Sequence, residues 1–305
     1  MLTCDNYHRP TTLEEALHLL REAPEGSRLV AGATDILPYA REGRGGDVHL
    51  PAMIDVTRIE ALSDYTIADG QVRLGANIVF QDFLTDTTLA RHLPCMPFCA
   101  VWFADDQIRE QATLAGNLIN ASPAADGTPA VLAMNGAVEL ARLEGGAVAR
   151  RTVPVADFVK GPGRTDLAPD EIVTAVICDS LDGYGGAFEK VGQRRSLVIS
   201  VACAAAVVKT DVSGQFFEDV RIALGGVGPV PQRLNDIEEK LVGERISAGI
   251  IAKASSAAVE RVASRSRIAY RRRVVAGFVE AAIEDALAAA NAPVHTRMQR
   301  EETHV

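Results

Sequence analysis

Apolar and polar residues recur along this chain with two periods, one typical of helices and one typical of strands. The segment Thr11–Glu15 predicts a helix start, because a threonine can cap the helix and a glutamate can complete a capping box. The apolar face then follows helical spacing through Leu13, Ala16, Leu17 and Leu20. We expect this helix to end near Ala23, before Pro24 and Gly26. Residues 28–31 predict a short buried strand, and residues 32–35 predict a tight turn.

Two hairpins are predicted in the middle of the chain. Residues 65–74 alternate in polarity around Asp69-Gly70, and residues 138–153 do so around Gly145-Gly146. Helical patterns occupy residues 81–93 and the alanine-rich stretch after Thr128. Helices and strands therefore mix without the regular alternation of a parallel doubly wound sheet, and the predicted class is α+β.

A domain boundary is expected where glycines and aspartates gather at residues 178–186. Beyond it, residues 197–208 and 220–224 read as strands, and residues 235–241, 248–262 and 271–290 as helices. The last of these helices has an apolar stripe predicted to face the core: Val274, Val275, Phe278, Ala281, Ala282 and Ala286. The tail 292–305 has little apolar content, and we expect it to be disordered.

The composition narrows the class of protein. The chain has 305 residues, of which 48% are hydrophobic and 23% are charged, so two or three soluble domains are expected. A net charge of −9 argues against nucleic-acid partners, because binding phosphates requires clustered basic residues. No apolar run approaches the roughly 18 residues of a membrane helix, and the first residues lack a signal-peptide pattern. We therefore expect a cytoplasmic protein without a membrane span.

The cysteines favour reduced thiols over disulfides or metal. Their number is odd and their positions are scattered: Cys4, Cys95, Cys99, Cys178 and Cys203. Cys95 and Cys99 lie four residues apart, but the count and spacing fall short of an iron–sulfur cluster. We expect packed thiols and no metal in this chain.

Two segments could surround a phosphate-containing ligand. Residues 29–36 predict a strand that ends in small residues, whose exposed amides could surround an anion. The same residues could instead form an ordinary strand-to-helix turn capped by Thr34 or Asp35. Residues 112–126 carry short hydrogen-bonding side chains without a clear helix or strand period, which is typical of a functional loop. A purely structural loop could have the same composition.

The two common nucleotide-binding fingerprints are absent. The chain contains neither G-x-G-x-x-G nor G-x-x-x-x-G-K-[ST]. The nearest glycine cluster, residues 225–228, runs into Pro229 and Pro231 and reads as a turn at the end of a strand.

The two loops resemble those of a known family. Residues 30–35 look like the first flavin loop, and residues 113–117, with Ser122, Pro123 and Asp126, look like the second, in the FAD subunits of xanthine, carbon monoxide and nicotinate dehydrogenases. The resemblance extends to about Ala290, in the family's order and spacing. It includes residues 7–10, 107–109, 161–163, 170–172, 188–190 and 194–196.

The resemblance implies a fold and its domains. It implies a two-subdomain FAD-binding fold of the vanillyl-alcohol-oxidase-like type, followed by a C-terminal α+β domain of the CO dehydrogenase flavoprotein type. Residues 1–178 would form the FAD-binding region, with subdomains at about 1–57 and 58–178, and residues 179–291 would form the C-terminal domain.

The resemblance also implies which residues bind FAD, and none of them is catalytic. The diphosphate would lie on the first loop, at Val30, Ala31, Gly32, Ala33, Thr34, Asp35 and Ile36, and on Thr113, Ala115, Gly116 and Asn117 of the second. Ser122 and Asp126 would also contact the cofactor, while Phe103, Val173 and Lys190 would contact the flavin. A solvated lysine at a strand end is the alternative for Lys190. Ala33 and Ala115 replace the usual glycines, which costs about 1 kcal/mol at positive φ.

The implied function is electron transfer within a molybdenum hydroxylase. A large molybdopterin-binding subunit would oxidise the substrate, and a small subunit with two [2Fe–2S] clusters would relay electrons to the FAD of this chain. The acceptor would be one such as NAD, and the assembly a dimer of heterotrimers. A stand-alone FAD oxidoreductase and a flavin-free scaffold subunit remain as alternatives. The substrate would bind in another chain and is not encoded here.

Overall fold

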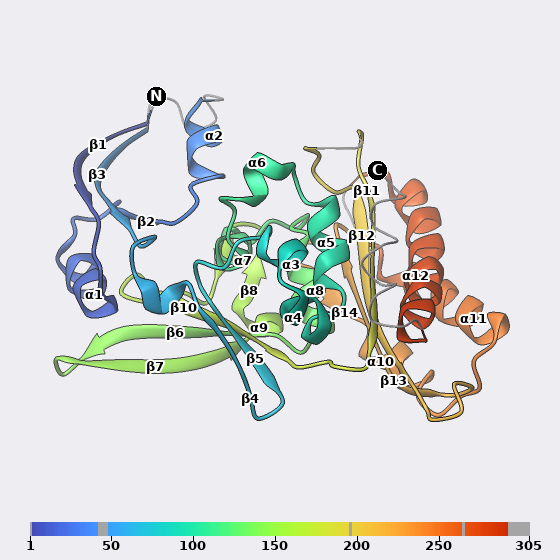
Figure 1. Cartoon of the computed structure of the whole chain (residues 1–305). Coiled ribbons are helices and arrows are strands. Elements are labelled where there is room, and N and C mark those ends of the chain that lie inside the picture. Colours follow the sequence, from blue (N-terminus) through green and yellow to red (C-terminus); the bar gives the residue numbers. More distant parts are fainter. Residues whose placement is uncertain (1, 42–47, 195–196, 264–265, 292–305) are drawn as a thin grey trace.

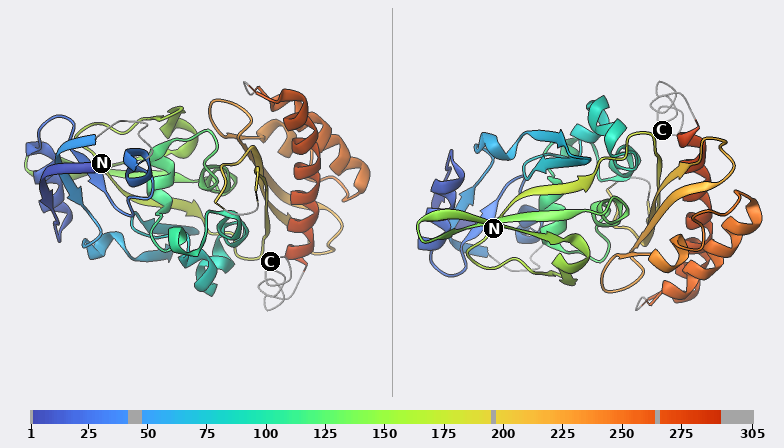
Figure 2. Two further views of the ribbon diagram at one scale, coloured as in Figure 1. Left: turned by 90° about the horizontal axis from the view of Figure 1, so that it is seen from above. Right: turned by 90° about the horizontal axis from the view of Figure 1, so that it is seen from below.

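The chain forms three successive parts, each built on its own β-sheet (Figure 1). The computed structural model describes residues 2–41, 48–194, 197–263 and 266–291; the tail predicted to be disordered, residues 292–305, lies outside these ranges. Views from above and below show the three parts in chain order along the long axis of the molecule (Figure 2). The predicted α+β class is confirmed, because the described helices and strands do not alternate regularly.

The first part is a small parallel sheet with two helices. Its elements are β1 (Leu2–His8), α1 (Leu13–Glu22), β2 (Arg28–Val30), α2 (Ile36–Arg41) and β3 (Val48–Asp55). The strands are in the order β1-β3-β2. The helix α1 begins as predicted: Thr12 accepts a hydrogen bond from the Glu15 amide at 3.2 Å, and Glu15 accepts one from the Thr11 amide at 2.9 Å.

The second part is an antiparallel sheet surrounded by short helices. Its strands are β4 (Tyr65–Ala68), β5 (Gln71–Gly75), β6 (Ala137–Glu144), β7 (Ala147–Pro154) and β10 (Ile172–Asp179), in the order β4-β5-β10-β6-β7. Both predicted hairpins are confirmed, β4 with β5 and β6 with β7. The small pair β8 (Val159–Gly161) and β9 (Arg164–Thr165) lies beside them.

The chain between β5 and β6 forms a series of short helices, and one more short helix follows β7. They are α3 (Asp82–Thr85), α4 (Thr87–His92), α5 (Met96–Trp102), α6 (Asp106–Arg109), α7 (Leu114–Asn120), α8 (Gly127–Ala133) and α9 (Val155–Phe158), with a 3-10 turn η1 (Glu60–Leu62) before β4. The segment 81–93, predicted to be helical, forms two short helices and not one. Asp86 is extended and accepts hydrogen bonds from the amides of Thr88 and Leu89, so it ends α3 and caps α4.

The third part is an antiparallel meander covered by helices. It contains β11 (Gly185–Val191), β12 (Ala202–Thr210), β13 (Phe217–Gly225) and β14 (Gln232–Arg233), followed by α10 (Asn235–Glu238), α11 (Ala248–Ala258), η2 (Val259–Arg261) and α12 (Ile268–Ala290). The strand expected from residue 197 begins only at Ala202, and the helix expected at 248–262 gives way to η2 after Ala258.

The C-terminal sheet is buried on both faces. Along β12, the side chains of Cys203, Ala205 and Val207 join the core of the second part, while those of Ala204 and Ala206 join the core beneath α12. This alternation follows from the two-residue period of a strand. The central helices α5 and α8 pack on one face, and α12 packs on the other (Figure 1). The second and third parts therefore share one hydrophobic core.

Candidate functional site

A cavity of about 510 Å³ lies where the first part meets the second. The turn between β2 and α2 forms one wall, and α7 with the start of β10 forms the others. Many of the residues predicted to bind the cofactor line it: Val30, Ala31, Gly32, Ala33, Thr34, Asp35, Ile36, Phe103, Thr113, Ala115, Gly116, Asn117 and Val173. The fold thus brings together two loops that are about 80 residues apart in the chain.

The first loop passes very close to the chain before α7. A Cβ placed on Gly32 would lie 1.7 Å from the carbonyl oxygen of Gln111, so only glycine fits there. The next residue, Ala33, has φ 55, in the left-handed region that alanine adopts at a cost of about 1 kcal/mol. A strained turn is retained because its surroundings hold it in place.

The amides of this loop are available to a ligand. Within the described part of the chain, no protein acceptor receives a hydrogen bond from the backbone N–H of residues 32–35. The carbonyls of Ala33 and Asp35 instead accept bonds from Leu37 and Tyr39 at the start of α2. Backbone N–H groups that line a cavity and lack acceptors suit the oxygens of a phosphate.

The second loop is largely helical, which corrects the expectation of an irregular segment at 112–126. Thr113 caps α7 by accepting a hydrogen bond from the Gly116 amide at 3.0 Å. The helix is too short for an apolar period to stand out in the sequence. Ala115 lies inside α7 and so does not require positive φ, whereas Ala33 does. Only one of the two alanine substitutions is therefore strained.

The aromatic ring of Phe103 lines another side of the cavity. The ring of Phe103 stacks on that of Phe80 with a centroid distance of 3.8 Å and an interplanar angle of 6°. Phe80 is fully buried, and Phe103 lines the cavity. Val173, on β10, lies in the same lining. These apolar surfaces suit a flat ring system better than a charged group.

The charged residues that line the cavity are the carboxylates Asp35 and Glu171 and the guanidinium of Arg28. Burial raises the pKa of Asp35, which belongs to the first loop and lines the cavity. Glu171 accepts two hydrogen bonds from Arg151, at 2.6 and 2.7 Å, and this guanidinium lowers the pKa of Glu171. A bound diphosphate would therefore meet neutral backbone dipoles on the first loop, and Arg28 is the one cation among the described lining residues.

Asn77 is a cavity residue that sequence reasoning missed. Its Nδ2 donates to the carbonyl of Val56 at 2.9 Å. Its buried Oδ1 accepts no hydrogen bond from any described residue. Asn77 follows the strand β5 and the small residues Gly75 and Ala76. This is the same signal that identified the first loop. Arg28 and Tyr39 also line the cavity and were not predicted.

Three predicted residues do not line the cavity. Lys190 donates to Asp126 Oδ2 at 2.6 Å and to the carbonyl of Trp102 at 3.0 Å, and Ser200 donates to Asp126 Oδ1 at 2.5 Å. The Lys190 side chain is 2% exposed, so the alternative of a solvated lysine is wrong. Ser122 accepts a bond from the Ala124 amide in a turn. Contact of these residues with the flavin stays a prediction.

The cysteines lie away from the cavity lining. Cys95, Cys99, Cys178 and Cys203 are buried as free thiols, and burial raises the pKa of Cys95 to about 12. Such thiols are poor nucleophiles and poor metal ligands, because both roles need the thiolate. In the described ranges, no group of His, Cys, Asp or Glu side chains is arranged to hold a metal ion. Nor does any described helix combine the length and apolar character needed to cross a bilayer.

Comparison with known proteins gives matches along nearly the whole chain. The family model for the FAD binding domain in molybdopterin dehydrogenase matches residues 3–178, and that for the CO dehydrogenase flavoprotein C-terminal domain matches residues 187–298. The xanthine dehydrogenase FAD-binding subunit of Escherichia coli O157:H7 is 30% identical, over 93% of this chain and 97% of that protein. The nicotine 6-hydroxylase medium subunit of Paenarthrobacter nicotinovorans is 32% identical, over 92% and 96%.

A solved structure also matches nearly the whole chain. Carbon monoxide dehydrogenase from Hydrogenophaga pseudoflava matches with a TM-score of 0.84 at 26% identity, over 93% of this chain and 97% of that one.

Proposed function

The chain belongs to the family of FAD-binding subunits of molybdopterin-dependent dehydrogenases, and we propose that it transfers electrons through an FAD held in the cavity between its first two parts. Its cofactor is FAD, and it is a subunit of an oxidoreductase complex. In this family the partner subunits carry molybdopterin and [2Fe–2S] clusters. The flavin supplies a centre that accepts and releases electrons, and this chain supplies the surroundings of that centre.

One observation carries the proposal: the first loop, whose amides at residues 32–35 have no acceptor within the described part of the chain, lines the same cavity as the second loop. Gly32 permits the close approach of the two segments. We propose that these amides hold the diphosphate, that Phe103 and Val173 contact the ring system, and that Asn77 Oδ1 accepts a hydrogen bond from the cofactor. The chain's task is then to bind, to orient and to exclude water from the cofactor.

We further propose the path of the electrons and the assembly. Electrons would arrive from the [2Fe–2S] subunit and leave to an acceptor such as NAD, within a dimer of heterotrimers that also contains the molybdopterin subunit. Residues 1–178 would bind the cofactor, with subdomains at about 1–57 and 58–178, and residues 179–291 would support them. Copurification of an iron–sulfur subunit and a molybdenum subunit tests the assembly, and their absence would favour a stand-alone flavoprotein.

A charge placed in the first loop tests the site. Ala33→Glu would set a carboxylate among the amides, and one unit charge repels another by roughly 3 kcal/mol at about 5 Å and an effective dielectric of about 20. This corresponds to about a hundredfold weaker FAD binding. Ala33→Gln, which has the same size without the charge, and Ala33→Ser are the controls.

The measurements are the visible spectrum of the purified chain and chromatography of the extracted flavin. We expect Ala33→Glu to remain folded by circular dichroism but to lose flavin, while Ala33→Ser stays yellow and Ala33→Gln loses less flavin than Ala33→Glu. Full flavin occupancy in Ala33→Glu would show that this loop does not bind the diphosphate. Extraction of FMN alone would contradict the dinucleotide, and a colourless wild-type complex would favour the flavin-free scaffold.

A further inference from the structure

The helix α8 lies between the cavity wall and the C-terminal sheet. Every residue from Gly127 to Ala133 is buried. The helix packs on α7, which lines the cavity, and also on β12, β13 and β14 of the C-terminal sheet. A shift of the C-terminal sheet relative to the cavity would therefore also displace α8.

A cation of the C-terminal sheet is bonded at the start of α8. Asp126, at the N-cap position, pairs with Lys190 of β11 at 2.6 Å. The turn before it is also attached to this sheet, because the amide of Gly226 donates to the carbonyl of Pro123 at 2.8 Å. Both side chains of the ion pair are almost fully buried, at 2% and 7% exposure. The start of α8 is therefore held by contacts that water does not screen.

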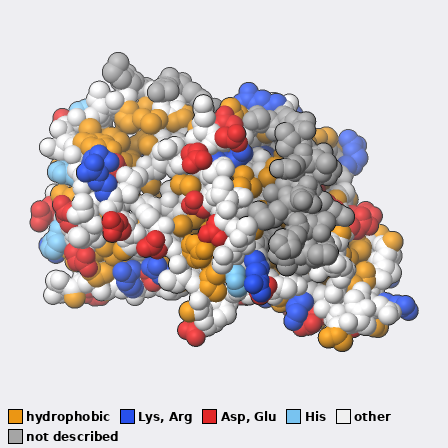
Figure 3. Space-filling model, in the orientation of Figure 1, with side chains coloured by type: hydrophobic (Ala, Val, Ile, Leu, Met, Phe, Trp, Pro, Cys, Tyr) orange, Lys and Arg blue, Asp and Glu red, His pale blue; other side chains and the backbone are white. Residues whose placement is uncertain are grey.

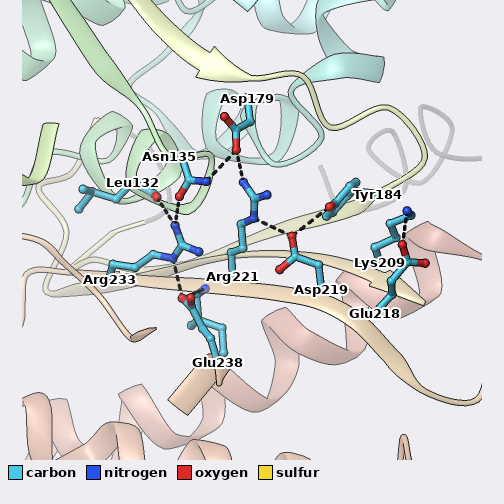
Figure 4. Close-up of polar contacts among 11 residues, drawn as sticks. Leu132, Asn135, Asp179, Tyr184, Lys209, Glu218, Asp219, Arg221, Arg233 and Glu238 are labelled. Atoms are coloured by element: carbon cyan, nitrogen blue, oxygen red, sulfur yellow. Dashed lines mark hydrogen bonds and ion pairs between the residues drawn. The ribbon is translucent and has the colours of Figure 1, made fainter. Parts of the chain in front are cut away.

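A second cation of the same sheet is bonded at the end of α8 (Figure 4). Arg233 of β14 donates through Nη1 to the carbonyl of Leu132 at 3.0 Å and to Asn135 Oδ1 at 2.6 Å. Its Nε donates to Glu238 Oε1 at 2.6 Å, which fixes the guanidinium. A positive charge is favourable at this end of a helix, where carbonyls lack partners within the helix.

Arg221 extends the second set of contacts. Asn135 also donates through Nδ2 to Asp179 Oδ2 at 2.7 Å, and Arg221 of β13 donates to the same oxygen at 2.7 Å (Figure 4). Asn135 has φ 53, a conformation that asparagine tolerates better than most residues. Asn135, two residues after the end of α8, is therefore attached both to the end of β10 and to the C-terminal sheet.

The start of α8 is in turn bonded to the cavity wall. The amide of Gly127 donates to Asn117 Oδ1 at 3.1 Å, and Asn117 lines the cavity. A Cβ on Gly127 would lie 2.7 Å from that oxygen and 2.9 Å from Leu114 Cδ1. The two helices thus touch with no room for a methyl group, and a shift of α8 must move Asn117 or break its hydrogen bond.

We propose that Lys190 and Arg233 are positioning residues: they hold α8 at both ends and thereby fix the wall of the cavity that α7 forms. The C-terminal domain then determines how tightly the cofactor is retained, although the cavity lining contains none of its described residues. This inference rests on the proposed function, in which FAD occupies the cavity. It assigns a role in cofactor retention to Arg233, which acts through α8 and not by contact with the ligand.

Arg233→Met in the full chain tests the proposal, because it removes the donors and keeps the aliphatic stem. Arg261→Met is the matched control, since it removes a guanidinium from an ion pair between η2 and α10 of the same domain. FAD is titrated into each flavin-free chain, and binding is followed by flavin fluorescence. We expect Arg233→Met to raise the Kd for FAD about tenfold, equivalent to about 1.4 kcal/mol, and Arg261→Met to change it less than about twofold.

Hydrogen exchange gives a second measurement that does not require the cofactor. In the flavin-free chain, we expect Arg233→Met to lower the protection of amides in both α8 and α7, while Arg261→Met leaves both unchanged. If Arg233→Met does not fold, Arg233→Lys replaces it. A lysine retains the charge but cannot make all three hydrogen bonds, so an intermediate effect is expected.

The outcomes separate the two proposals. Unchanged FAD affinity in Arg233→Met, or lower protection confined to α8, would overturn the positioning role. A wild-type chain that binds no FAD would instead overturn the proposed function. In that case the hydrogen-exchange comparison alone decides whether Arg233 holds α7 through α8.

Discussion

Replacing Lys190 with methionine should destabilise the whole chain, and not only the flavin site. The Lys190 ammonium lies 2.6 Å from Asp126 Oδ2, and the two side chains are 2% and 7% exposed. Methionine keeps much of the aliphatic length but leaves the Asp126 carboxylate buried without its cation. Asp126 would retain the hydrogen bond from Ser200. Removing one partner of a buried ion pair costs about 3–5 kcal/mol, because the other charge stays uncompensated.

The loss should depend on pH in a defined direction. Burial raises the pKa of Asp126, and Lys190 opposes that rise. Without Lys190, the carboxyl of the folded chain should have a still higher pKa than in the unfolded chain. Such a group favours folding at low pH, and this contribution is lost as the pH rises through the folded-state pKa. The defect of Lys190→Met should therefore be smallest in acid and grow toward neutral pH.

Urea unfolding followed by circular dichroism measures the effect. We expect Lys190→Met and Asp126→Asn each to lower the free energy of unfolding, and the double variant to recover a large part of the loss. The coupling energy of this double-mutant cycle should reach about 2 kcal/mol, within the range found for contacting residues. Single losses that add to within about 0.5 kcal/mol would refute the buried ion pair. A defect that shrinks as the pH rises would refute the account of Asp126.

Three further variants test other features. Gly32→Ala places a Cβ 1.7 Å from the Gln111 carbonyl, so we expect loss of the flavin spectrum and a lower melting temperature, and a normal spectrum would contradict the close approach. Ala33→Gly relieves a residue at φ 55 and should raise the melting temperature by up to about 4 °C; a lower value would mean that this turn is unstrained. Burial, reinforced by Asp285, raises the pKa of Glu189 to about 7, so the wild-type chain should lose stability as the pH rises through 7. Glu189→Gln should flatten this dependence in urea unfolding, and an unchanged slope would assign it to other groups.

Local signals in the sequence predicted local structure well. The hairpin at Asp69-Gly70 forms because both residues adopt positive φ, at 51 and 74, which this pair tolerates. The helix α1 begins at its predicted capping box because the participating groups lie within four residues of one another. Residues 29–36 were likewise predicted as a possible anion-binding turn from a strand followed by small residues, and they line the cavity.

Features set by distant residues could not be predicted. The buried ion pair of Lys190 could not be predicted, because its partner Asp126 lies 64 residues earlier. The split between α3 and α4 depends on how Asp86 is oriented, since its side chain caps the second helix. The lack of a hydrogen-bond partner for Asn77 Oδ1 can be recognised only in the folded chain, because distant residues form the cavity around it. The long-range contacts that determine these features leave no periodic trace in the sequence.

A sheet buried on both faces also limits how such a chain can change by recombination. The residues of β12 pack alternately against the central helices and against α12, so neither neighbour can be exchanged without meeting side chains selected for another partner. A crossover between two relatives in residues 180–184, which separate β10 from β11, would join central helices from one parent to a C-terminal sheet from the other. The side chains that pack between them would then come from two different sequences. The same crossover would also divide Asp126 from Lys190 and Asn135 from Arg233. Productive chimeras of this family should therefore inherit α8 and the C-terminal sheet from one parent.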